Sequence, residues 1–264
     1  MRIDVCVPVL HKPPTQFEEM LKRELPVNEI IYSFAKPLGT ARQELIEKVT
    51  TDWFVFVDDD VELLPGWWDE VWRLVDPLTG AVEGLWSYTV EPEVDAYQNA
   101  MADLARALGK KTSVERLVRA FTGDALIRTE LVKDIKIPPV PVYEDEFIKQ
   151  HIITKGPNQR RTPDARSFVL PDNERYRWKR TSGVVCLHHR GLNIGQAWIA
   201  GYYAYYFGRM TPKQAVKNLV TIGPKTLYAV WRTGMWKIIP MQLNRELRTS
   251  LGCLTAWAKG DRFQ

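Results

Sequence analysis

The stretch that decides the fold is Trp53-Phe54-Val55-Phe56-Val57-Asp58-Asp59-Asp60, in which five large apolar residues run directly into three carboxylates. An apolar run of this length predicts a strand that is buried on both faces, as at the centre of a parallel sheet. In open α/β sheets, ligands bind beyond the carboxyl ends of the strands. The stretch therefore predicts an α/β fold with an acidic site at one edge of its sheet.

The three adjacent carboxylates indicate a metal site. Their negative charges repel one another, and a bound cation relieves that repulsion. Carboxylate oxygens without nearby thiols favour Mg²⁺ or Mn²⁺. The alternative is a solvated acidic turn, because Asp is common in turns. We expect a cation to lie among these carboxylates.

On either side of this strand, segments with strand and helix patterns alternate. Strands are predicted at 3–9, 29–34, 81–90 and 120–128, and helices at 16–25, 95–108 and 144–154. Such alternation predicts a mostly parallel, Rossmann-like sheet with helices on both faces.

Length and cysteine content limit the class of protein. The 264 residues suffice for one large domain, or for one domain with an appendage. The three cysteines are far apart and have no spacing typical of zinc or of a disulfide framework. The chain opens with Met1-Arg2-Ile3-Asp4 and predicts no signal peptide. A reducing, cytoplasmic setting is therefore expected.

Charge divides the chain into two parts. Residues 201–264 carry ten Lys or Arg and two acids, a net charge of +8, so an overall +4 leaves −4 on the first 200 residues. We therefore predict a catalytic domain over 1–190 and a basic helical appendage over 191–264.

Lys and Arg mixed with Trp and Tyr in this appendage are typical of a membrane interface. Residues 191–208 lack charged side chains, but their polar residues and tyrosines favour a helix lying in the interface over one spanning the bilayer. We expect peripheral association with the inner face of the cell membrane. The alternative is a helical subdomain that packs its aromatic rings on the catalytic core. No nucleic-acid motif is present, and no nucleic-acid partner is expected.

A second acidic group is Tyr143-Glu144-Asp145-Glu146-Phe147, which follows a proline-rich run and opens a predicted helix. Acids at a helix N-terminus are stabilised by the macrodipole, which explains them without any function. A rigid helix start beyond a sheet edge is also a suitable place for a general base.

Five segments in order resemble the family 2 glycosyltransferases of the GT-A fold, over roughly residues 1–190. They are the strand at 3–9, the small-residue-plus-Arg segment 39–43, the acids 58–60 with the turn 65–67, the strand and Gly loop 121–128, and the pair 144–145. The resemblance implies inverting transfer of a hexose from a nucleoside diphosphate sugar, GDP- or UDP-linked, to a hydroxyl group. The acceptor would be a lipid-linked glycan, a polyprenyl phosphate or another hydroxyl compound.

The same resemblance assigns residues to roles. Asp145 would be the catalytic base. The nucleotide sugar would be bound by Pro8, Arg42, Asp58, Asp59, Asp60 and Gly123. The acceptor side would include Asp124, Glu144, Arg177 and Trp178. The Mn²⁺ or Mg²⁺ ligands would be Asp58, Asp60, His188 and His189, and alternation along a strand predicts that only one of the two histidines ligates. For Arg42, a position on the helix surface is the alternative to a phosphate contact.

Two rival classes of function remain open. A sugar-1-phosphate nucleotidyltransferase shares the sheet and the metal acids, but it would need a Gly-rich phosphate loop after the first strand, where this chain has residues 10–14, Leu-His-Lys-Pro-Pro. The other rival is a non-catalytic, membrane-associated protein on a GT-A scaffold.

Overall fold

The computed structural model describes residues 1–11, 13–89, 91–111, 120–156, 175–189 and 194–262. Its strands are β1 (Ile3–Pro8), β2 (Val27–Ser33), β3 (Trp53–Val57), β4 (Val61–Leu63), β5 (Thr79–Tyr88), β6 (Asp124–Arg128) and β7 (Arg177–His188). Its α-helices are α1 (Thr15–Glu24), α2 (Leu38–Lys48), α3 (Trp67–Trp72), α4 (Pro92–Ala107), α5 (Glu144–Ile153), α6 (Ile194–Tyr206), α7 (Pro212–Thr233) and α8 (Ile238–Lys259). A 3₁₀ turn, η1 (Thr129–Leu131), follows β6.

The described strands form one seven-stranded sheet in the order β2-β1-β3-β6-β5-β7-β4. The predicted α/β class is confirmed, but the sheet is mixed and not mostly parallel. Strands β2, β1 and β3 are parallel, whereas the pairs β3–β6, β5–β6 and β4–β7 are antiparallel. Hydrophobic patterns identify a strand but not its direction, which depends on how the connecting segments return the chain.

The central strand β3 is buried on both faces, as predicted. Val55 and Val57 point into one hydrophobic cluster, and Phe54 and Phe56 point into the other. Neighbouring β1 alternates in the same way, because successive side chains of a strand lie on opposite faces of the sheet.

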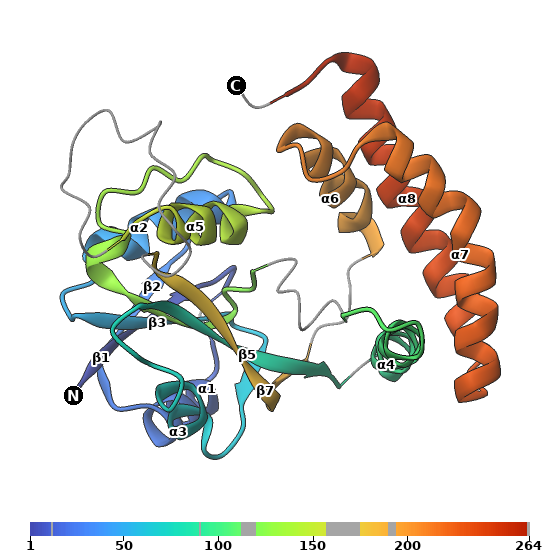
Figure 1. Ribbon diagram of the computed structural model, residues 1–264. Coiled ribbons are helices and arrows are strands. Elements are labelled where there is room, and N and C mark those ends of the chain that lie inside the picture. Colours follow the sequence, from blue (N-terminus) through green and yellow to red (C-terminus); the bar gives the residue numbers. More distant parts are fainter. Residues whose placement is uncertain (12, 90, 112–119, 157–174, 190–193, 263–264) are drawn as a thin grey trace. The chain divides into compact units, whose positions relative to one another are not determined.

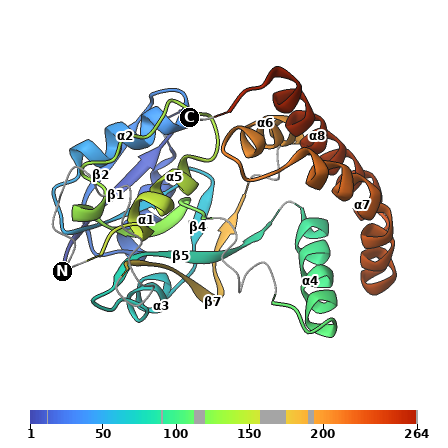
Figure 2. The same ribbon diagram turned by 45° about the horizontal axis from the view of Figure 1, so that its top comes forward.

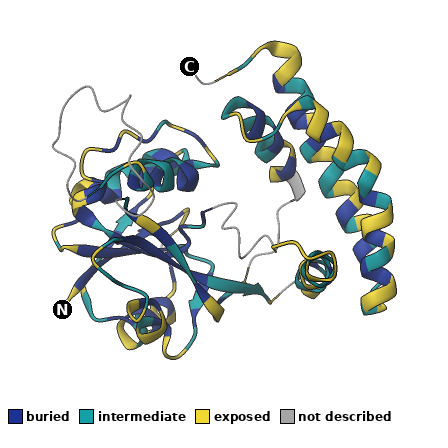
Figure 3. Cartoon of the chain, viewed as in Figure 1, coloured by how far each residue is buried: buried dark blue, intermediate teal, exposed yellow. Residues whose placement is uncertain are grey.

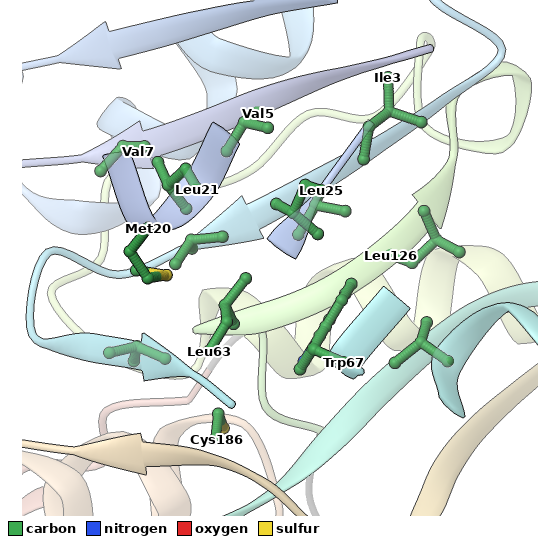
Figure 4. Packing of buried hydrophobic residues seen from close by; sticks show 14 of the residues in the cluster. Ile3, Val5, Val7, Met20, Leu21, Leu25, Leu63, Trp67, Leu126 and Cys186 are labelled. Atoms are coloured by element: carbon green, nitrogen blue, oxygen red, sulfur yellow. The ribbon is translucent and has the colours of Figure 1, made fainter. Parts of the chain in front are cut away.

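Helices cover both faces of this sheet. Helices α1 and α3 pack against one face, and α2 and α5 against the other (Figure 1). Figure 4 shows the first cluster, where Leu21 and Met20 of α1 meet Val5 and Val7 of β1, and Trp67 of α3 is fully buried nearby. The strand that leads to Asp58 is therefore packed between a helical layer on each face of the sheet.

The chain divides into two compact units. The first contains Met1–Ser87 and Arg119–His188, and the second contains Tyr88–Val118 and His189–Gln264. Helix α4 therefore belongs with the C-terminal helices, where it shares a small apolar cluster with α7 and the start of α8. The sequence predicted a single boundary between residues 190 and 191, and these two positions lie outside the described residues.

In the second unit, α6, α7 and α8 lie side by side in both views (Figures 1 and 2). Helices α6 and α8 approach closely where each has a glycine. A Cβ atom at Gly252 would lie 2.0 Å from the Trp198 carbonyl oxygen, and one at Gly201 would lie 1.8 Å from that of Thr249. Over the described residues, no helix combines the length and apolarity needed to cross a membrane.

This close approach predicts that Gly252→Ala destabilises the α6–α8 pair. Ala normally favours a helix over Gly by about 1 kcal/mol, but here the added methyl group meets backbone, and overpacking typically costs about 1–3 kcal/mol. Thermal unfolding followed by circular dichroism should therefore show a lower midpoint. Ala258→Gly, at an exposed position of α8, measures helix propensity alone. A midpoint raised by Gly252→Ala would contradict the packing argument.

Candidate active site

Three strands bring the predicted donor-side residues to one edge of the sheet. Strands β1 and β3 run parallel, with Cys6 opposite Phe56. Two residues further along, both strands reach the same edge at Pro8 and Asp58. Strand β6 runs antiparallel and starts at this edge, just after Gly123. The main-chain N–H of Asp58 donates a hydrogen bond to the Gly123 carbonyl oxygen at 2.9 Å.

Gly123 is required by the closeness of its neighbours. A Cβ atom there would lie 2.3 Å from the Phe121 ring and 2.8 Å from Oδ2 of Asp58. Any side chain would therefore push the loop away from the Asp58 carboxylate.

Arg42 connects the donor-side acid to the second acidic group. It lies on α2 and is 2% exposed, so the alternative of a helix-surface position is wrong. Its guanidinium lies 3.1 Å from Asp58 Oδ1 and 3.1 Å from Glu144 Oε1. It also donates to the Thr122 carbonyl oxygen at 3.1 Å. One buried cation thus joins β3, the loop before β6, and the start of α5.

Glu144 and Asp145 open α5, as predicted, and both are 4% exposed. The preceding residue, Tyr143, has a φ of 71°, in the left-handed region that non-glycine residues rarely adopt. Such strained positions cluster at functional sites. The next residue, Glu146, accepts a hydrogen bond from the main-chain N–H of Ala120 at 3.3 Å, which links the helix start to the loop before β6.

Asp124 is the first residue of β6 and is fully buried. Its place on the acceptor side stays a prediction. Its Oδ2 accepts hydrogen bonds from Trp67 Nε1 at 3.2 Å and from Cys186 Sγ at 3.0 Å. Burial raises the pKa of the Asp124 carboxyl from 3.8 to about 7, although both hydrogen bonds oppose the rise.

Trp178 is buried, with 5% exposure, and its indole N–H donates to Glu83 Oε2 at 2.5 Å. Its place on the acceptor side stays a prediction. Its neighbour Arg177, at the start of β7, is exposed. Glu83 also pairs with Arg180 and accepts from the main-chain N–H of Phe121 at 2.7 Å.

The two histidines occupy different surroundings. His188 is 6% exposed at the end of β7, where its ring packs on Phe121 with centroids 4.9 Å apart. It lies opposite Val61, the residue directly after Asp60. His189 lies in the second unit, with Nδ1 3.2 Å from the Thr89 hydroxyl oxygen.

No group of three His, Cys, Asp or Glu side chains within the described part of the chain is close enough to hold a metal ion. The donor set still suits Mg²⁺ or Mn²⁺, because such ions are commonly held by one or two carboxylates together with substrate phosphates and water. Asp58 is oriented by Arg42, and its side chain keeps 23% exposure.

A comparison with models of protein families identifies the family to which residues 17–135 belong. Residues 17–135 match the model described as Glycosyl transferase family 2. These residues form a family 2 glycosyltransferase domain. A comparison with curated proteins gives no match.

Solved structures are similar to this chain in fold. A crystal structure described as a mycobacterial protein has a TM-score of 0.50 at 12% identity, over 77% of this chain and 72% of that one. Glucosyl-3-phosphoglycerate synthase from Mycobacterium tuberculosis, in complex with Mn²⁺ and UDP-glucose, has a TM-score of 0.49 at 12% identity, over 77% of both chains. The mixed sheet and its flanking helices are of the GT-A class.

Glu83 is a buried acid beside the site that the sequence alone did not identify. It lies inside a predicted strand among apolar residues, at Ala81-Val82-Glu83-Gly84, and an acid in such a run is itself a signal. Burial raises its pKa to about 6, with Arg180 opposing the rise. A buried acid of this kind needs partners, and only the fold identifies them.

The buried Asp124 predicts a pH-dependent stability. Between about pH 4 and pH 7, the folded chain keeps a proton on Asp124 that the unfolded chain has released. The free energy of unfolding should therefore fall as the pH rises, by at most about 1.4 kcal/mol per pH unit. Asp124→Asn cannot titrate but retains an oxygen acceptor for Trp67 and Cys186.

Denaturant titrations of both proteins at pH 4, 5, 6 and 7 test this prediction. The stability of the variant relative to the wild type should increase across that range. A difference that is independent of pH would show that Asp124 is ionised in the folded protein.

Proposed function

We propose that the protein is an inverting glycosyltransferase. It transfers a hexose from a nucleoside diphosphate sugar, GDP- or UDP-linked, to a hydroxyl acceptor. The observation that carries the proposal is the buried Arg42, which pairs with Asp58 on the donor side and with Glu144 beside the proposed base, inside a family 2 domain.

In this mechanism Asp145 accepts the proton of the acceptor hydroxyl. The acceptor oxygen attacks the anomeric carbon from the face opposite the diphosphate, and the bond from that carbon to the diphosphate oxygen breaks. The anomeric configuration is inverted, and the nucleoside diphosphate leaves. The rigid start of α5 supports this role, because a general base must be held within hydrogen-bonding reach of the proton it removes.

Arg42 and Gly123 have positioning roles. The paired Arg42 holds the Asp58 and Glu144 carboxylates in fixed places, and Gly123 lets the loop before β6 approach Asp58. Asp58 and Asp60 are the residues proposed to hold Mn²⁺ or Mg²⁺ with the donor phosphates. His188 is the third candidate, because it pairs across β4 and β7 with Val61, the residue after Asp60. When bound, that ion would act as a Lewis acid and neutralise charge on the leaving diphosphate.

We also propose that the acceptor is lipid-linked, a glycan or a polyprenyl phosphate, and that the protein works at the inner face of the cell membrane. The support is the basic, aromatic composition of residues 191–264, and the large exposure of Trp231 (77%) and Trp236 (71%).

A donor screen tests the function. The protein is incubated with each GDP- and UDP-hexose and with Mn²⁺ or Mg²⁺, in the presence and absence of a polyprenyl phosphate. Release of nucleoside diphosphate supports the proposal. A sugar-1-phosphate nucleotidyltransferase would instead consume a nucleoside triphosphate and release pyrophosphate, and a non-catalytic protein would do neither.

The metal assignment predicts that EDTA abolishes turnover and that added Mn²⁺ or Mg²⁺ restores it. Asp60→Ala should remove turnover and weaken Mn²⁺ binding, measured by calorimetry, while the circular dichroism spectrum is unchanged. Asp69→Ala, an exposed acid on α3, is the control and should behave as the wild type. Full activity in EDTA would refute the metal requirement.

The base assignment predicts that Asp145→Asn lowers kcat by roughly 10²–10⁴-fold, the usual effect of losing a general base. The change is nearly isosteric, so donor affinity should persist. Glu130→Gln, the same acid-to-amide change at an exposed position, should keep its turnover. Undiminished kcat in Asp145→Asn would move the role to Glu144, and a product with retained configuration would contradict direct displacement.

A further inference from the structure

Helix α7 carries an exposed apolar stripe along most of its length. The stripe consists of Val216, Val220, Pro224, Leu227 and Trp231, which recur every three or four residues and therefore share one face of the helix. Val220, Leu227 and Trp231 are 72%, 61% and 77% exposed. Over these residues the stripe is about 22 Å long at 1.5 Å per residue.

The opposite face of α7 is already occupied. Ala215, Ile222 and Thr226 are buried, as are Ala229 and Val230, which pack in a cluster with Ile238 at the start of α8. The stripe is therefore a second apolar face and is not needed to hold the helical unit together. Figure 3 shows exposed residues along α7 and α8.

The charges beside the stripe have one sign. Helix α7 contains Lys213, Lys217, Lys225 and Arg232 and no acid. Arg232 lies 3.7 Å from Asp103 of α4. A helix with cations beside an apolar face suits an anionic lipid surface, where the side chains of the stripe enter the acyl region and the lysines meet headgroups.

We propose that the outer face of α7 is a membrane-docking surface that lies flat on anionic lipid, with Val220, Leu227 and Trp231 inserted. The repeated lysines favour lipid over a second copy of this chain, since two such faces would bring like charges together. The apolar stripe also favours lipid over nucleic acid, whose phosphates leave apolar side chains without a partner. The inference specifies the membrane partner proposed above, but it does not depend on the donor chemistry.

A site-specific fluorophore tests the insertion. The three native cysteines are all buried, so Val220→Cys provides one accessible thiol for an environment-sensitive dye. On phosphatidylglycerol vesicles at low salt, its emission should shift to the blue and strengthen. Gln214→Cys is the matched control, because it is exposed on the same helix but lies about 120° around it from position 220. A dye there should respond less.

A second pair of variants tests the energetics. Leu227→Glu should reduce partitioning into anionic vesicles roughly ten-fold or more, because it removes an inserted side chain and adds a repelled charge. Val184→Glu, at an exposed position on β7, should have no effect on partitioning. Nucleoside diphosphate release without a lipid acceptor should be unchanged in Leu227→Glu, which separates this inference from the proposed chemistry.

Three outcomes would overturn the proposal. They are no dye response to anionic vesicles at low salt, an equal response at positions 214 and 220, and a lipid-free dimer of the wild type that Leu227→Glu dissociates. The last outcome would assign the stripe to a second copy of this chain.

Discussion

The candidate site depends on one buried cation. Arg42 is almost inaccessible to water and is flanked by the carboxylates of Asp58 and Glu144. Removing one partner of a buried pair leaves an uncompensated charge and typically costs about 3–5 kcal/mol. The positions of α2, of the end of β3 and of the start of α5 are therefore coupled electrostatically as well as by packing.

A second buried acidic layer supports the loop that meets Arg42. Glu83 accepts from the main-chain N–H of Phe121, and Asp124 accepts from Trp67 and Cys186. The carbonyl groups of Thr122 and Gly123 lie between these two anchors and bond to Arg42 and to the Asp58 main chain. Glu83 and Asp124 thus fix the two ends of the short loop before β6.

The helical unit is held by close helix packing, in contrast to the buried ion pairs around Arg42. Its inner contacts include glycines that let α6 and α8 approach, while α7 keeps an apolar stripe and several lysines on the outside. Composition alone indicated a basic, aromatic segment. In the structure, Tyr205 of this segment is buried in the helical unit, whereas Trp231, Trp236 and Trp257 are exposed.

The sequence by itself determined the central strand, the acids at its end, the helix that begins at Glu144, and the family resemblance. The first three are local, because an apolar run, an acidic run or a helix start is encoded by neighbouring residues, and the resemblance adds up several such local segments. Tertiary structure alone decided the antiparallel return of β6, the burial of Arg42, Asp124 and Trp178, and the grouping of α4 with the C-terminal helices. These features depend on partners that are distant in the chain, and an ionisable side chain has the same local sequence signature whether it meets water or a buried counter-charge.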